Sequence, residues 1–143
     1  MNFTDDSSIE PFLKDFEAQY IAQQEAEHPD ADATFNYGWA LIRSKPVQNV
    51  VKGRKLMQDL LSRGYNKTDC LYYVAMADYK LDNALEARKN LETILRVDPE
   101  CRPAKILLQS VDDKISKDGW VGVGLAGLGI AAVAGVLSAI SRK

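Results

Sequence analysis

Apolar residues recur at helical spacing along most of this chain. The first such stripe predicts a helix over about residues 8–25 and comprises Ile9, Phe12, Leu13, Phe16 and Tyr20. The segment 28–30, which contains a proline, ends this helix, and Asp30 or Asp32 can cap the next one. A late stripe predicts a helix over about 102–117 and comprises Ala104, Leu107, Leu108, Val111 and Ile115.

Between these two helices the chain repeats a helix pair. The first pair is predicted near 33–44 and 50–63, and the second near 69–81 and 84–97. The second pair fits the tetratricopeptide (TPR) pattern, a 34-residue helix-turn-helix unit, when Pro99 is its closing proline. Small residues then occupy the two sites at which the antiparallel helices approach each other, and these residues are Ala75 and Ala87.

In the first pair the two small sites hold glycine. Gly53 precedes Ala87 by 34 residues, as one repeat requires, whereas Gly38 precedes Ala75 by 37. We therefore expect three extra residues in the turn of the first pair, around 45–49.

The pattern predicts an all-α protein, a six-helix TPR-like bundle in which two tandem helix pairs are flanked by capping helices. Two residues depart from the repeat, because Tyr65 replaces the closing proline of the first pair and Asp78 stands where a large apolar residue is usual. We expect a flexible N-terminal arm at 1–7, a cytosolic helical domain at 8–117 and a C-terminal tail anchor at 118–143.

The tail carries the strongest membrane signal. Residues 120–140 contain no charge, and a helix of this length spans about 31 Å, enough to cross a hydrocarbon core of roughly 30 Å. Trp120 stands where an interfacial aromatic belongs, and Ile140 ends the run. We expect a transmembrane helix at the C-terminus, which makes this a tail-anchored protein, with Gly119 as a break or hinge before the span.

Within that span three small residues are spaced by four and share one face: Gly127, Ala131 and Gly135. Such spacing lets two membrane helices pack closely and form a homo-oligomer. The other interpretation is that glycine and alanine only lower the hydrophobicity of the span.

The first helix of each TPR pair lines the concave face, so its outward positions are candidates for partner binding. When the helical register is counted from the small residues of the two first helices, the outward positions are Phe35, Trp39, Ile42, Tyr72, Met76 and Tyr79. Apolar residues at solvent-facing positions often mark a binding site. The alternative is that the first helix covers these residues with Phe12 and Phe16.

Composition adds mainly exclusions. A net charge of −2 without a basic stripe argues against nucleic acid. Cys70 and Cys101 are expected to be free thiols, and His28 is the only histidine. We find no metal-ligand spacing, phosphate loop or nucleophile elbow, so we expect no enzyme activity, metal or cofactor.

Several segments together resemble the mitochondrial fission 1 protein family. They are residues 35–44 (FNYGWALIRS), 70–75 (CLYYVA), 79–81 (YKL), and 117–119 (KDG) with Gly122 leading into a Gly/Ala-rich tail. The resemblance extends from the first helix to the end of the chain.

The resemblance implies a cytosolic six-helix bundle anchored in the outer mitochondrial membrane, and often in peroxisomes. It implies a partner, a dynamin-related GTPase, recruited directly or through adaptors to the six candidate positions for organelle fission. It also implies that the N-terminal arm regulates access.

Two other functions fit a tail-anchored helical protein. One is a receptor for protein import at the mitochondrial surface, because an apolar groove also suits an amphipathic presequence. The other is a membrane-permeabilising regulator of cell death, against which the 34-residue repeat speaks. Depletion of the protein separates fission from import, since elongated mitochondria favour a role in fission and accumulating precursors favour a role in import.

Overall fold

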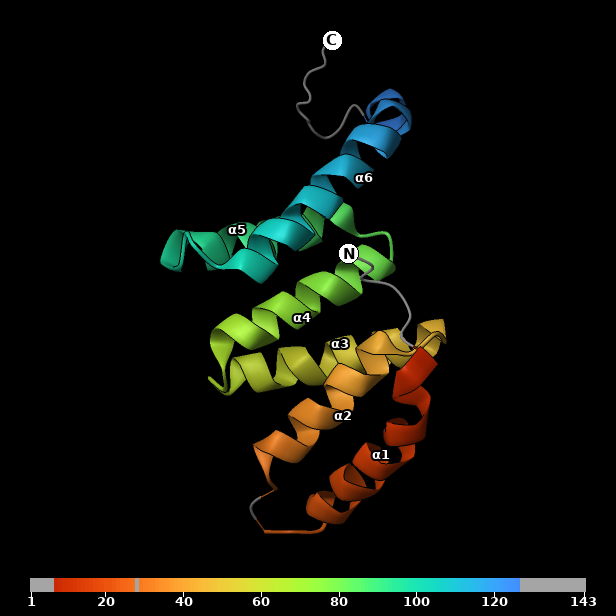
Figure 1. The fold of residues 1–143 in the computed structure, drawn as a ribbon, viewed down its shortest axis with the longest axis vertical. Coiled ribbons are helices and arrows are strands. Elements are labelled where there is room, and N and C mark those ends of the chain that lie inside the picture. The colour runs from red at the N-terminus through yellow and green to blue at the C-terminus, as the bar shows by residue number, and fades with distance from the viewer. Residues whose placement is uncertain (1–6, 28, 127–143) are drawn as a thin grey trace. The chain divides into compact units, whose positions relative to one another are not determined.

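The computed structural model describes residues 7–27 and 29–126, and within these ranges the regular structure is helical (Figure 1). The elements are a 3-10 turn, Ser7–Ile9, and six α-helices: α1 (Glu10–Gln24), α2 (Ala31–Arg43), α3 (Val47–Ser62), α4 (Lys67–Lys80), α5 (Ala84–Val97) and α6 (Arg102–Ala126). The all-α, six-helix prediction is confirmed. Among the described residues, those up to Leu108 belong to one compact unit and those from Gln109 to Ala126 belong to a second.

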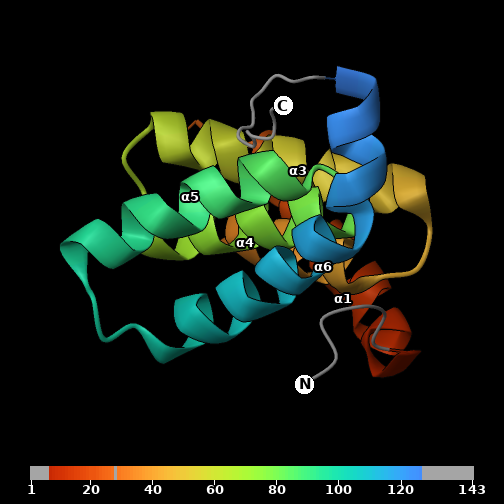
Figure 2. The same cartoon turned by 90° about the horizontal axis from the view of Figure 1, so that it is seen from above.

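Within the first unit, each helix from α1 to α5 packs against the next in chain order, so that α4 lies against both α3 and α5 (Figures 1 and 2). The core between them is built from side chains that the helical stripes provide. The largest fully buried apolar ones in this unit are Ile42, Met57, Leu60, Met76, Leu91 and Leu107. Burying each contributes about 1.5–3 kcal/mol relative to an exposed side chain.

Helices α2 and α3 approach each other most closely at Gly38 and Gly53, the two sites at which the repeat pattern predicts the contact. A Cβ atom on Gly53 would lie 2.7 Å from the carbonyl oxygen of Gly38 and 2.8 Å from Cγ1 of Ile42. No side chain fits there without moving the backbone. In the second pair, Ala75 and Ala87 are fully buried, as the pattern predicts.

The three extra residues of the first pair are not in its turn, and that prediction was wrong. The turns 44–46 and 81–83 have the same length, and the additional residues form the first turn of α3. Pro46 allows this because its carbonyl oxygen accepts hydrogen bonds from the amides of Asn49 and Val50, at 3.0 and 3.2 Å. The extra chain gains helical hydrogen bonds that a loop would leave to water.

Helix α1 is the most exposed element of the first unit, since it contributes no buried residue. Polar contacts help to hold it. The hydroxyl of Tyr37 on α2 donates to Glu17 of α1 at 3.1 Å and accepts from Lys52 of α3 at the same distance. The rings of Tyr20 and Tyr37 also pack against each other at a tilt, with centroids 5.0 Å apart. At the start of α2, Asp30 caps the helix by accepting from the amide of Asp32 at 2.9 Å.

Helix α6 does not end at Lys117 as expected, but continues without a break through Gly119 to Ala126. Each glycine costs a helix only about 1 kcal/mol, so Gly119, Gly122 and Gly124 weaken this part of α6 without ending it. Within 7–27 and 29–126, no helix is both long and apolar enough to cross a bilayer. Trp120 lies in α6, whereas Gly127, Ala131, Gly135, Ile140 and most of the arm at 1–7 lie outside the described residues, so these predictions stay predictions.

Candidate functional site: the face of α2 and α4

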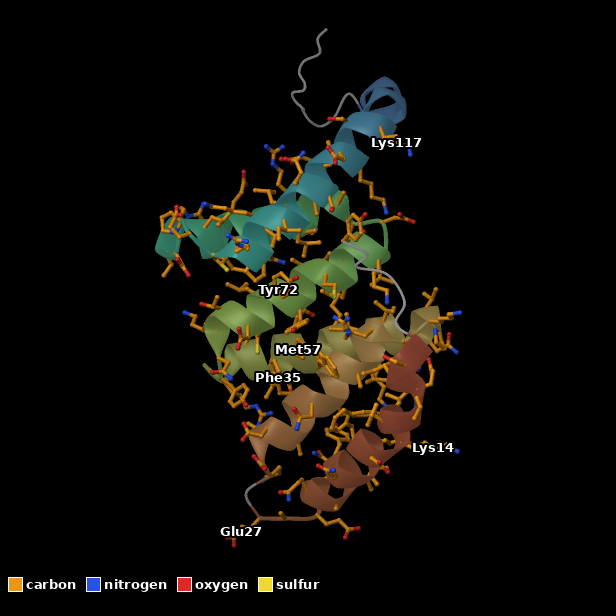
Figure 3. All side chains as sticks on the ribbon, in the orientation of Figure 1. Lys14, Glu27, Phe35, Met57, Tyr72 and Lys117 are labelled. Carbon is orange, nitrogen blue, oxygen red and sulfur yellow. The ribbon has the colours of Figure 1, made fainter. Side chains whose placement is uncertain are left out.

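The six candidate residues lie on two helices that contact each other, α2 and α4. Four of them are half-buried, with part of each side chain reaching solvent: Phe35, Trp39, Tyr72 and Tyr79. Ile42 and Met76 are 0% and 2% exposed, so they do not face solvent as the register suggested. We call the four half-buried side chains the aromatic face, with Ile42 and Met76 beneath it. Figure 3 labels Phe35 on α2 and Tyr72 on α4.

Phe35 joins the two helices through a cluster of rings. Its centroid lies 5.9 Å from that of Tyr65 and 5.8 Å from that of Tyr73. Tyr73 in turn meets Tyr72 edge to face at 5.1 Å. The hydroxyl of Tyr65 donates to Asp32 near the start of α2. Edge-to-face and tilted ring pairs contribute about 0.5–1.5 kcal/mol each beyond the area that they bury, so the cluster stabilises this end of the face.

At the other end of the aromatic face, Trp39 makes most of the contacts. The ring of Phe16 on α1 packs edge-on against it at 6.4 Å, and the guanidinium carbon of Arg43 lies 5.3 Å from its ring centroid. The indole N–H donates a hydrogen bond to the hydroxyl of Tyr73. Phe16 therefore covers part of Trp39, as the alternative interpretation requires, while Phe12 is 54% exposed.

Three phenols of this region, those of Tyr65, Tyr72 and Tyr73, are neutral at physiological pH. Burial raises the pKa of Tyr72 to about 12 and also raises the pKa of Tyr73, whose bond from Trp39 opposes the rise. The hydrogen bond to Asp32 raises the pKa of Tyr65 to about 12. The face thus offers neutral rings with one guanidinium beside them, a surface suited to apolar partner side chains.

The cysteines and the metal-ligating side chains can be examined in the described part of the chain. Cys70 and Cys101 are free, and burial raises the pKa of the Cys70 thiol to about 11, which keeps it protonated. Among the residues that the structure describes, no three His, Cys, Asp or Glu side chains lie close enough to hold a metal ion.

Sequence reasoning missed three residues of the site: Arg43, Tyr65 and Tyr73. Arg43 follows Trp39 by four positions, the spacing at which helical side chains meet, and this could have indicated the cation–π contact. Tyr65 was noted only as a missing proline. Tyr73 is adjacent to Tyr72 in sequence, and nothing in the repeat pattern indicates that it reaches Phe35.

Comparison with known proteins agrees with the helix pairs. The model described as the Fis1 N-terminal tetratricopeptide repeat matches residues 32–64, and that of the Fis1 C-terminal tetratricopeptide repeat matches 68–120. Relatives include the mitochondrial fission 1 protein of Yarrowia lipolytica, 34% identical over 140 residues, covering 92% of this chain and 88% of that protein. The human mitochondrial fission 1 protein is 33% identical over 142 residues, covering 95% and 93%.

Solved structures show the same fold. The crystal structure of the fission protein Fis1 from Saccharomyces cerevisiae has a TM-score of 0.71 and 25% identity, covering 78% of this chain and 86% of that one. Yeast Fis1 in complex with an Mdv1 fragment has the same TM-score and identity, covering 76% and 86%. Both repeats, nearly full-length sequence similarity and the shared fold place this chain in the mitochondrial fission 1 protein family, and so associate it with mitochondria and their division.

Proposed function

We propose that this protein is a tail-anchored adaptor of the mitochondrial outer membrane that recruits a dynamin-related GTPase, directly or through another adaptor, for fission. We propose that it is also present in the peroxisomal membrane and acts there in peroxisome fission. The aromatic face is its partner-binding surface. The observation that carries this is the set of half-buried rings on adjoining helices, Phe35, Trp39, Tyr72 and Tyr79.

Support for a protein partner at this face comes from its physical character. Half-buried aromatic rings lose little conformational entropy on binding and gain apolar area, which makes them effective anchors. An amphipathic helix that presents apolar residues three and four positions apart matches the spacing along α2 and α4. A relative of the chain, yeast Fis1, has been solved with an Mdv1 fragment containing the N-terminal extension and coiled coil domains.

In this proposal the chain binds and does no chemistry of its own, and nucleotide hydrolysis belongs to the GTPase. The apolar stretch 120–140 supplies the anchor, with Trp120 at the membrane surface. The small residues Gly127, Ala131 and Gly135 face a second copy if the spans associate. The anchor concentrates the adaptor on the organelle surface, where the GTPase must assemble.

The binding test compares alanine substitutions on the aromatic face with one elsewhere on the surface. The full-length chain in detergent micelles is titrated with the Mdv1 fragment, alongside Trp39→Ala and Tyr79→Ala. Because each removes a central aromatic anchor, we expect affinity to fall by about 10- to 100-fold. Leu85→Ala is the matched control, since Leu85 is an apolar side chain of α5 that is 70% exposed.

If both face variants keep the helical circular dichroism of the wild type and bind the fragment equally well, the assignment of the face is wrong. If the wild type instead binds an amphipathic presequence peptide and not the fragment, the protein is an import receptor.

A further inference from the structure

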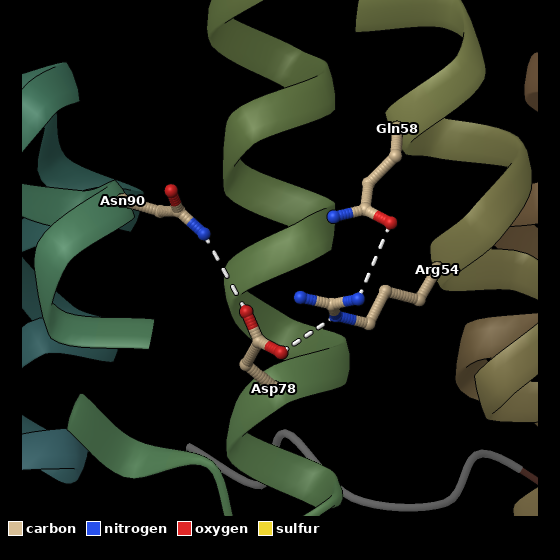
Figure 4. A network of polar contacts seen from close by, with 4 residues as sticks. All are labelled: Arg54, Gln58, Asp78 and Asn90. Carbon is tan, nitrogen blue, oxygen red and sulfur yellow. Dashed lines mark hydrogen bonds and ion pairs between the residues drawn. The ribbon is translucent and has the colours of Figure 1, made fainter. Parts of the chain in front are cut away.

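Asp78 is a carboxylate buried at a position where the TPR pattern places a large apolar residue. Its side chain is 0% exposed. The Nε atom of Arg54 on α3 donates to its Oδ1 at 2.6 Å, and Nδ2 of Asn90 on α5 donates to its Oδ2 at 3.4 Å (Figure 4). Gln58, one turn further along α3, accepts from the Arg54 guanidinium at 3.2 Å and helps to hold it. One carboxylate therefore links helices of both pairs.

A second polar link starts two residues further along α4. The ammonium of Lys80 donates to the carbonyl oxygens of Ile42 and Ser44, the latter at 3.1 Å. These carbonyls lie at the C-terminal end of α2, where a helix leaves its last carbonyls without intrahelical partners. The end of α4 thus contacts α3 through Asp78 and α2 through Lys80.

These links differ from the apolar contacts around them in how they respond to movement. Apolar packing is non-directional, so a helix that turns slightly can repack its side chains. A buried carboxylate that loses its guanidinium is left as an uncompensated charge, which is strongly unfavourable. The ion pair therefore permits a narrower range of angles between α3 and α4 than a leucine at the same site would.

We propose that Asp78, with Arg54, is a positioning residue that fixes the angle between the two helix pairs. It thereby sets the separation of the α2 rings from the α4 rings on the aromatic face. Its importance for partner affinity rests on the function proposed above. Its effect on the angle does not.

The geometric test replaces the pair by apolar residues of similar size, Arg54→Met/Asp78→Leu, in the full-length chain in micelles. Spin labels are carried on unnatural amino acids at Asn36 of α2 and Val97 of α5, both exposed, so that Cys70 and Cys101 stay unmodified. We expect the melting temperature to stay within about 5 °C of the wild type, because such replacements are often neutral. The distribution of label-to-label distances becomes broader. An unchanged distribution overturns the proposal.

Two further variants keep the test decisive. Arg88→Met/Glu92→Leu removes an exposed ion pair within α5, whose atoms are 3.4 Å apart, and should leave the distribution unchanged. Asp78→Asn keeps the shape of the side chain and removes its charge, so it replaces the double variant in the distance measurement if the double variant does not fold. We expect it to broaden the distribution partway, and a distribution like the wild type's contradicts the proposal.

The functional consequence is measured with the Mdv1 fragment. We expect affinity to fall about tenfold in Arg54→Met/Asp78→Leu and to stay unchanged in Arg88→Met/Glu92→Leu. Equal affinity in all three chains shows that the angle does not govern recognition and overturns that part of the proposal. A wild type that does not bind the fragment counts against the proposed function, while the distance measurement still decides the positioning role.

Discussion

Gly53 and Gly38 show how much a single hydrogen atom in place of a methyl group can matter. They face each other where α2 and α3 cross, but their surroundings differ. A Cβ on Gly53 meets a backbone oxygen at 2.7 Å, whereas a Cβ on Gly38 meets first the flexible Cε of Met57, at 3.2 Å. The first contact cannot relax without separating the helices, and the second can.

We therefore predict that Gly53→Ala lowers the free energy of unfolding by about 3 kcal/mol, because overpacking at a helix crossing forces the backbone to shift. For Gly38→Ala the change should stay within about 1 kcal/mol, since alanine's better helix propensity offsets the movement of Met57. Urea denaturation followed by circular dichroism measures both. Equal losses for the two variants would show that the crossing is looser than described.

The tyrosines make stability depend on pH at the alkaline end. An unfolded tyrosine loses its proton near a pKa of 10, whereas in the folded chain Tyr65 and Tyr72 hold theirs to a pKa of about 12. The folded state thus binds more protons between pH 10 and 12. The stabilisation from these neutral phenols is complete below pH 10 and is lost as the pH rises towards 12.

Denaturation midpoints measured from pH 8 to 12 test this. We expect a flat region up to about pH 10 and then a decline, which Tyr72→Phe makes shallower because it removes one of the titrating groups. A decline of unchanged steepness in Tyr72→Phe counts against the buried, neutral Tyr72.

At the scale of helices, the hydrophobic period predicted which elements exist, and turn chemistry decided where they end. Helix α5 has the predicted bounds, since Pro99 and a regular repeat define it on both sides. The sequence does not place the start of α3, because three extra residues fit equally well in a turn or in a helix. Only the structure shows that the carbonyl oxygen of Pro46 accepts hydrogen bonds from the amides of Asn49 and Val50, which puts these residues in the helix. The end of α6 differs from the predicted Lys117 because Gly119, expected as a break or a hinge, does not interrupt the helix.

Helix α1 should be the least stable helix of the first unit, because it has no buried side chain and contacts the rest through Phe16, Tyr20 and a few polar groups. We expect its amides to exchange with deuterium faster than those of α3 and α4, which lie in the core. Hydrogen exchange with mass spectrometry measures this on the full-length chain. Protection of α1 equal to that of α4 would contradict the account.

For the molecule as a whole, the sequence predicted which residues share the face of α2 and α4 better than it predicted their individual exposure. Helical register groups Phe35 with Trp39 and Tyr72 with Tyr79, and the structure keeps these groupings. Register does not predict how deeply neighbouring helices bury a position, so Ile42 and Met76 were expected at the surface. The contacts of Tyr65 and Asp78 depend on helices that are distant in sequence, and no local pattern indicates them.

We propose above that a membrane-tethered helical scaffold captures a fission partner through its aromatic face. The most direct measurement is mitochondrial length in cells that lack this protein and receive the full chain, Trp39→Ala, or a chain ending at residue 117. We predict elongated, connected mitochondria without the protein, and normal length only with the full chain. Normal length with either altered chain, or unaltered mitochondria with accumulating precursors when the protein is absent, would contradict capture of a fission partner by a tethered aromatic face.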